Sequence, residues 1–256
     1  MAGFWGVWRR DQPSTAERDL VRMGQGLVLS GAPLTRSAGG FGAAAVAQHS
    51  SGQDAIRQTA DGAWLVGTAR LDNRAELCTL LDGAVRPGAA FSDLDLVERA
   101  YLRWGERCVE YLRGDWALAI WQPAARRLFL ARDQFGITSL YYAVEDGAVA
   151  FATLRKPLLA WERKLAAADD LYLAHLLLSW KVYNGGSTPH AAIRRLPPAH
   201  TLTVTADGAI VTHCYWRMMD AVSEQPPSTL AEAAAEARIH FDAAVRCRLR
   251  PGETVA

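Results

Sequence analysis

The chain has 256 residues and half of them are hydrophobic, so it can form one large domain, or one and a half, with an ample core. Its formal net charge is +1, and basic residues form no run longer than pairs such as Arg9-Arg10. These values argue against a disordered chain and against nucleic acid or an anionic membrane as the partner.

The four cysteines, at positions 78, 108, 214 and 247, lie far apart and form no CxxC motif. This spacing is typical of reduced cysteines and argues against a metal site. The first apolar segment is too short for a signal peptide, and its positive charges follow it instead of preceding it. No apolar run reaches the length of a membrane span. We therefore expect a cytoplasmic protein without a metal site.

The first 90 residues predict a mixture of strands and helices. Residues 15–23 have the spacing of a short helix, and a second helix is predicted from Asn73 to Leu81, ended by Gly83. Short runs of small or apolar residues predict strands over residues 2–8, 39–47 and 63–71.

Residues 91–152 carry the densest set of spaced features. Ser92 stands at an N-cap position, and Asp93 and Asp95 favour the positive end of a helix dipole, so a helix is predicted from Asp93. Gly105 interrupts the apolar spacing and Gly114 ends it, which predicts two consecutive helices. Strands are predicted from residue 116 to a turn at 122–126, and over 128–131, 140–143 and 149–152. We expect these strands to form one antiparallel meander.

The last hundred residues predict a helix, a hairpin, a linker and a final helix. The first helix begins at Asp169 or Asp170 and ends near Trp180, and the hairpin joins residues 202–204 and 210–212. Residues 230–249 have a strongly amphipathic helical pattern. Because an uncovered apolar face would lie in water, we expect a second domain or a separate chain to cover this helix.

Several spaced motifs follow one another along the chain. They are Leu71-Asp72-Asn73-Arg74-Ala75-Glu76-Leu77, Ser92-Asp93-Leu94-Asp95, Trp104-Gly105, Leu112-Arg113-Gly114-Asp115, Arg132-Asp133-Gln134-Phe135-Gly136-Ile137, Leu140-Tyr141-Tyr142 and Ile193-Arg194-Arg195-Leu196-Pro197-Pro198-Ala199-His200. In type and order they resemble the amino-terminal glutaminase domain of the asparagine synthetase family, which includes β-lactam synthetases and lasso-peptide cyclases. The resemblance implies an α+β fold, a four-layer αββα sandwich of two antiparallel sheets like that of the N-terminal-nucleophile hydrolases.

The resemblance also implies a domain organisation. Residues 1–221 would form the glutaminase-like domain (class II amidotransferase), residues 222–229 a linker rich in proline and polar residues, and residues 230–256 the first helix and strand start of an ATP-dependent synthetase domain. In the family that strand leads into an SGG-x-DS loop, which wraps the pyrophosphate of ATP and which this chain does not reach. We therefore expect no cofactor in this chain, and ATP and Mg²⁺ only with the missing synthetase domain.

The glutaminase chemistry of the family uses a cysteine at position 2 as the nucleophile, and this chain has Ala2 there. The resemblance places Thr68 and Ala69 where the family has the Asn-Gly pair of the oxyanion hole. The family's substrate-carboxylate arginine has no convincing counterpart near Gln48-His49-Ser50. Only Asp93 matches a substrate-binding residue, the aspartate that holds the glutamine α-amino group. The sequence therefore predicts a degenerate glutaminase with no catalytic residue and a vestigial glutamine site at Asp93.

Each of the notable polar residues also has a purely structural interpretation. Asp93 suits the first turn of a helix without any ligand, and Asn73 suits a helix cap. Arg132 and Asp133 fit a structural pair at the end of a strand, and His200 fits a residue that orders a turn.

Three functions compete. The leading one is the amino-terminal part of an ATP-dependent amide-forming enzyme, with the synthetase domain or a separate chain carrying it as partner and a peptide or small carboxylate as substrate. The second is a non-catalytic module that binds a partner protein or peptide; an SGG-x-DS segment after Ala256 or in a neighbouring gene would favour the first. The third, an amidohydrolase that uses Cys78, Cys108, Cys214 or Cys247, is disfavoured because no base adjoins these residues.

Overall fold

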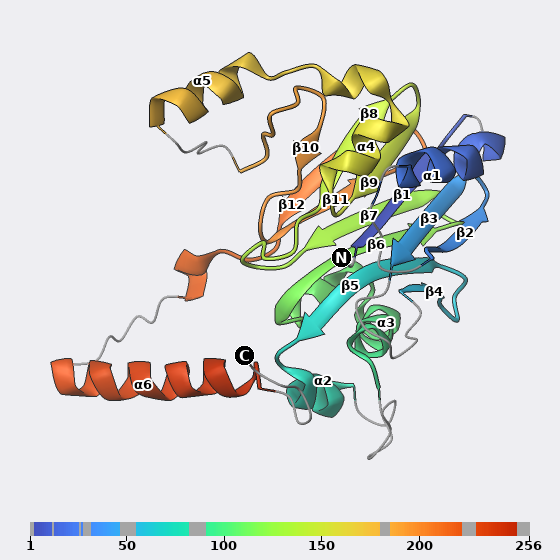
Figure 1. Cartoon of the computed structure of the whole chain (residues 1–256). Coiled ribbons are helices and arrows are strands. Elements are labelled where there is room, and N and C mark those ends of the chain that lie inside the picture. Colours follow the sequence, from blue (N-terminus) through green and yellow to red (C-terminus); the bar gives the residue numbers. More distant parts are fainter. Residues whose placement is uncertain are drawn as a thin grey trace.

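The computed structural model describes residues 3–11, 13–25, 27, 32–46, 55–81, 91–179, 185–221 and 229–249. Within these residues the chain forms two stacked antiparallel sheets of six strands each, with helices on their outer faces (Figure 1). The four-layer αββα sandwich expected from the sequence is therefore confirmed.

The first sheet has the strand order β10-β8-β9-β1-β3-β2, and β1 (Gly3–Arg9) lies between β9 and β3. Its other strands are β2 (Leu34–Ala38), β3 (Phe41–Val46), β8 (Tyr141–Glu145), β9 (Ala148–Ala152) and β10 (Arg194–Arg195). The second sheet has the order β12-β11-β7-β6-β5-β4. Its strands are β4 (Ile56–Gln58), β5 (Trp64–Leu71), β6 (Gly114–Gln122), β7 (Arg127–Arg132), β11 (His200–Val204) and β12 (Ile210–Cys214).

Successive side chains along a strand point to opposite faces of its sheet, so each strand contributes to two layers of the core. In β1, Phe4 and Trp8 face the second sheet, whereas Trp5 and Val7 face the helices that cover the first sheet. Between the sheets the rings of Trp8 and Trp121 have centroids 4.6 Å apart. These large aromatic side chains fill the central layer and hold the two sheets together.

Each sheet has its own helical cover. α1 (Ala16–Gly24) and α4 (Arg155–Trp161) pack on the first sheet, and α2 (Arg74–Leu80) and α3 (Asp93–Trp104) pack on the second. By contrast, α5 (Asp170–Ser179) exposes much of its apolar surface, and α6 (Leu230–Arg246) has no buried residue. No helix among the described residues is long and apolar enough to cross a membrane.

Two expectations for residues 91–152 are wrong. The second helix is a short 3₁₀ helix, Gly105–Glu110, because a segment of only six residues leaves little room for α-helical turns. The predicted meander is split between the sheets: β6 and β7 belong to the second sheet, and β8 and β9 belong to the first. The segment from Asp133 to Leu140 carries the chain from one sheet to the other.

The other predicted elements are confirmed within a few residues of their ends, including the β11–β12 hairpin and the helix that begins at Leu230. The strands β2, β4 and β10 and the helix α4 are additional to those predicted. Several positions named in the sequence lie outside the described residues: Ala2, Gln48-His49-Ser50, Gly83, Trp180, residues 222–228 and residues 253–256.

Candidate functional site

The candidate site lies at the start of α3. Ser92 forms a capping box with Asp95: the Ser92 hydroxyl accepts a hydrogen bond from the Asp95 amide at 3.0 Å, and the Ser92 amide donates to the Asp95 carboxylate at 2.6 Å. This arrangement satisfies the first amide groups of the helix and fixes where it begins. Asp93 is therefore held in the first turn, where the helix dipole favours its charge.

Asp93 is buried, with 7% of its surface exposed, and its carboxylate forms an ion pair with Arg74 of α2. The same guanidinium donates a hydrogen bond of 2.6 Å to the Phe91 carbonyl. Arg74 thus joins the first turns of two helices and neutralises the one side chain that the sequence assigns to a glutamine site. A buried carboxylate requires such a partner.

A second arginine supports the same turn from β4. Arg57 lies 2.6 Å from Asp95 and 3.6 Å from Glu98. Burial of Asp95 opposes its ionisation, but hydrogen bonds from Ser92 and the positive charge of Arg57 outweigh this effect and lower the pKa of Asp95. The start of α3 therefore contains two carboxylates, each with its own arginine partner.

Thr68 and Ala69 lie on β5, opposite Ala117 and Trp116 of β6, and both are half-buried. Their neighbour Gly67 lies against Leu94 of α3, because a Cβ atom added to Gly67 would be 3.5 Å from Leu94 Cδ2. The structure thus brings the strand with Thr68 and Ala69 next to the helix with Asp93. At these two positions the chain offers a hydroxyl and a methyl group, and no side-chain amide.

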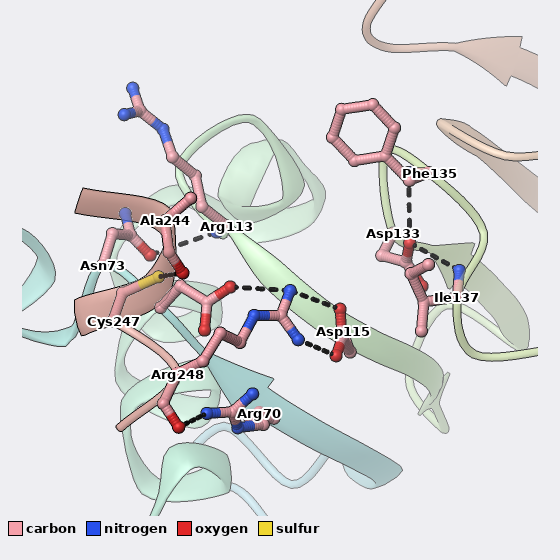
Figure 2. Close-up of polar contacts among 11 residues, drawn as sticks. Arg70, Asn73, Arg113, Asp115, Asp133, Phe135, Ile137, Ala244, Cys247 and Arg248 are labelled. Carbon is pink, nitrogen blue, oxygen red and sulfur yellow. Dashed lines mark hydrogen bonds and ion pairs between the residues drawn. The ribbon is translucent and has the colours of Figure 1, made fainter. Parts of the chain in front are cut away.

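Asn73 occupies the N-cap position of α2, but its side chain makes no capping hydrogen bond, so the predicted cap is wrong. Its amide instead contacts the turn before β6. It donates to the Tyr111 carbonyl at 2.9 Å and accepts from the Arg113 amide at 3.1 Å, the contact that Figure 2 shows. Asn73 therefore links the start of α2 to the turn before β6.

Arg132, Asp133 and His200 all contact the backbone, as the structural interpretation predicts, but Arg132 and Asp133 do not form the expected pair among the described residues. Asp133 is fully buried and accepts hydrogen bonds from the amides of Phe135, Ile137 and Thr138 at 3.0 to 3.1 Å. Figure 2 shows the bonds from Phe135 and Ile137. Arg132 donates to carbonyl groups, including those of Thr138 and Leu196. No ion pair joins Arg132 to Asp133 in the described part of the chain, so each residue orders backbone separately.

His200 and the cysteines also have structural surroundings. A ring nitrogen of His200 lies 2.7 Å from the Pro198 carbonyl. Burial raises the pKa of Cys108 to about 12, so its thiol stays protonated at neutral pH and is a poor nucleophile. Cys78, Cys108, Cys214 and Cys247 are free. Across the described ranges, no group of histidine, cysteine and acidic residues could hold a metal ion.

The sequence interpretation missed Arg74 and Arg57. A signal for Arg74 was available, because a positive charge in the first turn opposes the helix dipole and therefore points to an acidic partner elsewhere. Such a signal does not say which acid is the partner.

Comparison with protein-family models identifies the family of this chain. The family model described as a glutamine amidotransferase domain matches residues 37–216. The chain belongs to this family. The match covers α2, α3 and both sheets except β1 and most of β2, so it includes Thr68, Ala69 and Asp93.

The curated relatives that the chain matches include asparagine synthetases. The chain is 29% identical over 158 residues to asparagine synthetase [glutamine-hydrolyzing] 3 of Bacillus subtilis, covering 62% of this chain and 25% of that protein. It is 40% identical over 75 residues to a putative asparagine synthetase of Mycobacterium tuberculosis, covering 28% of this chain and 12% of that protein. The chain is an asparagine synthetase-like glutamine amidotransferase domain, and it spans a quarter or less of these relatives.

Solved structures support the fold. An allosteric regulatory enzyme of purine biosynthesis superposes with a TM-score of 0.54 at 15% identity, over 84% of this chain and 49% of that chain. Glutamine phosphoribosylpyrophosphate amidotransferase of Bacillus subtilis superposes with a TM-score of 0.52 at the same identity and coverage. At this identity the likeness establishes the N-terminal-nucleophile hydrolase fold and no more.

Proposed function

We propose that the chain is a glutaminase-like domain that does not hydrolyse glutamine and that serves an ATP-dependent amide-forming protein. The observation that carries this proposal is the ion pair between Arg74 and Asp93. If Asp93 corresponds to the aspartate that holds a glutamine α-ammonium group, the guanidinium of Arg74 takes the place of that ammonium. A substrate would have to displace an ion pair that the fold supplies.

The residue types at the other positions support the same proposal. Ala2 has no nucleophilic atom, and acyl transfer through the enzyme requires one. An oxyanion hole needs preorganised donors, and loss of one donor slows such reactions by roughly 100- to 1,000-fold. Thr68 and Ala69 carry no side-chain amide for this role. Cys108, buried and protonated, is unsuited to replace the missing thiol.

The type of amide-forming reaction follows from the ammonia that such a domain no longer supplies. Without ammonia from glutamine, the amide-forming reaction has to use an amine of the substrate, as β-lactam synthetases and lasso-peptide cyclases do. In this proposal an adenylating half, the synthetase domain of the same protein or a separate chain, binds ATP and Mg²⁺ and activates a carboxylate of a peptide or small molecule. The glutaminase-like domain then has an architectural role, and its cytoplasmic location stays a prediction.

The test measures ammonia release from glutamine and covalent labelling by a glutamine-analogue electrophile. The purified chain is expected to give neither. Ala2→Cys alone is expected to remain inactive, because Arg74 still pairs with Asp93 and the oxyanion donors are still absent. The combination of Ala2→Cys, Thr68→Asn, Ala69→Gly and Arg74→Ala is expected to be labelled. Ammonia release by the unaltered chain would refute the proposal, and full activity of Ala2→Cys alone would refute the role given to Arg74.

One observation favours the binding module as a second candidate. α6 has no buried residue, and Ile239 and Phe241 are each 68% exposed. Two further apolar side chains, Phe135 and Ile137, are 64% and 65% exposed. Carboxylate-dependent release of pyrophosphate from ATP by the full-length protein, together with an SGG-x-DS segment in its sequence, would support the amide-forming function. A full-length protein that has neither the pyrophosphate release nor the SGG-x-DS segment would support the binding module.

A further inference from the structure

A cavity of about 560 Å³ lies at the amino-terminal end of β1. It is on the side of the first sheet that faces the helices, since Trp5 and Leu159 in its wall belong to the cluster formed with α1 and α4. The residues that line it do not include Thr68, Ala69 or Asp93. The cavity therefore shares none of these three residues with the candidate glutamine site, although Gly3 in its wall follows Ala2 in the chain.

Most of the cavity wall is apolar and firmly held. The indole nitrogen of Trp5 donates a hydrogen bond of 3.3 Å to the Leu20 carbonyl, which fixes the ring and leaves its apolar surface toward the cavity. The hydroxyl of Thr153, also in the wall, accepts a hydrogen bond of 3.2 Å from the Phe4 amide. A preformed apolar cavity of this size is typical of a site for a small organic molecule.

His190 lines the cavity and contains a buried polar atom without a partner. The Nδ1 atom of His190 is buried and has no hydrogen-bond partner among the described residues. The backbone at His190 is well fixed, because its amide donates to the Thr188 hydroxyl at 3.1 Å and it bridges to Ala168. Buried polar atoms are rarely left unpaired in folded proteins, so this nitrogen calls for a bound partner.

The charged residues of the wall have one sign. Arg155 and Lys156 line the cavity, and no acidic side chain is among its described lining residues. No ion pair joins Arg155 to another described residue. The hydroxyl groups of Ser139 and Tyr141 add polar groups beside them. The wall thus combines a broad apolar surface with cations and hydrogen-bond donors.

We propose that this cavity binds a monocarboxylic acid with an aromatic or branched apolar body. The apolar body lies against Trp5 and Leu159. The carboxylate accepts a hydrogen bond from Arg155 and, once the His190 ring turns its buried nitrogen toward the cavity, a second one from His190. A planar carboxylate suits the fork of an arginine side chain, and a phosphate dianion would require more donors than a largely apolar wall offers.

The test is isothermal titration of the purified chain with 4-phenylbutanoate, its neutral amide and 3-phenylpropyl phosphate. One-to-one binding of the carboxylate, with the amide at least tenfold weaker, is expected. Equal affinity for acid and amide would overturn the proposal, because the cations would then have no role. Tighter binding of the phosphate would overturn the assignment of a carboxylate, and no measurable binding of any of the three compounds would overturn the site.

Variants locate the binding. Arg155→Gln and His190→Phe are each expected to weaken carboxylate binding by about tenfold, the cost of one hydrogen bond to a charged group, and to leave amide binding unchanged. Arg163→Gln removes a positive charge from an exposed residue outside the wall and is expected to have no effect. Leu159→Trp is expected to fill the cavity and abolish binding of both compounds. Equal losses for Arg155→Gln and Arg163→Gln would overturn the proposed contact.

Discussion

Replacement of Arg74 by alanine tests the ion pair on which the functional proposal rests. The Asp93 side chain is 6% exposed and the Arg74 side chain 36% exposed. Removing one partner of a buried ion pair costs roughly 3 to 5 kcal/mol, since the other charge stays buried, and the partial exposure of Arg74 reduces this. We expect Arg74→Ala to lower the free energy of unfolding by about 2 kcal/mol, which is about 6 °C in melting temperature for a chain of this size.

A double-mutant cycle separates the pair from its surroundings. Asp93→Asn and the double variant are measured together with Arg74→Ala by thermal and urea unfolding. The double variant is expected to be at least about 1 kcal/mol more stable than the sum of the single effects predicts, because the two side chains interact directly. Arg18→Ala, which alters an exposed arginine on α1, serves as the control and is expected to change stability by less than about 0.5 kcal/mol. Additive effects within about 0.3 kcal/mol would refute the ion pair.

The same variant tests the functional role of the pair. If Arg74 takes the place of a substrate ammonium group, its removal leaves Asp93 open to one. Glutamine at millimolar concentration is then expected to raise the melting temperature of Arg74→Ala and not that of the unaltered chain, because a ligand stabilises only the state that binds it. An equal response of the two proteins, whether zero or positive, would contradict this role.

Three further predictions concern the scaffold. Asp133→Ala is expected to lower the free energy of unfolding by about 4 kcal/mol, because three backbone amides lose their acceptor. Asp133→Asn is expected to lower it by about half of this. A loss of less than about 1 kcal/mol for both variants, measured by urea unfolding, would contradict the prediction. Arg248 lies 3.0 Å from Asp72 and also pairs with Asp115, and its carbonyl accepts a hydrogen bond from Arg70 (Figure 2). Arg248→Ala is expected to speed hydrogen exchange in α6 with little change in melting temperature, whereas the exposed Arg246→Ala is expected to change neither. The fold lowers the pKa of Asp95, so the ionised carboxylate stabilises the folded state above the unfolded pKa, and this stabilisation is lost on acidification. Between about pH 5 and pH 3 the free energy of unfolding is therefore expected to fall less for Asp95→Asn than for the unaltered chain. Equal losses in the two proteins would contradict this.

The elements that the sequence predicted well are those whose signals are local. Ser92 and Asp95 sit three residues apart and form the capping box that their spacing indicates. The strands that the sequence did not predict lack such signals. β2 has four exposed residues among its five, and β4 has only three residues. Alternation of apolar and polar residues, the main indicator of a strand, needs a buried face and several residues to be visible.

Sheet membership was not predictable for a different reason. β7 and β8 follow one another in the chain, but they pair in different sheets. The same short apolar pattern suits either sheet, and the choice depends on the path of residues 133–140. Likewise, the sequence indicated that Asp93 has a favourable local position but not that Arg74, 19 residues away, is its partner. Pairing across two helices is a tertiary property.

The Arg132–Ile137 motif shows what this chain retains from its family. Asp133 binds three amides of its own loop, and Arg132 binds carbonyls of Thr138 and Leu196. These contacts turn the chain from the second sheet to the first, so the motif has a folding role that needs no substrate. Phe135 and Ile137 remain exposed at the tip of that loop.

The positions that the family resemblance assigns to catalysis differ from the Arg132–Ile137 motif, because they do not keep the residue types of the family. In the proposed function, Ala2, Thr68 and Ala69 stand at the catalytic positions and lack the atoms that glutamine hydrolysis requires. Thr68 and Ala69 are accommodated in a regular pairing with β6. The chemistry of this family can therefore be lost by substitutions that leave both sheets intact, whereas loss of Asp133 would disturb the connection between them. On this argument, restoring the catalytic atoms should restore labelling without any change in the scaffold, provided that Arg74 is removed from Asp93.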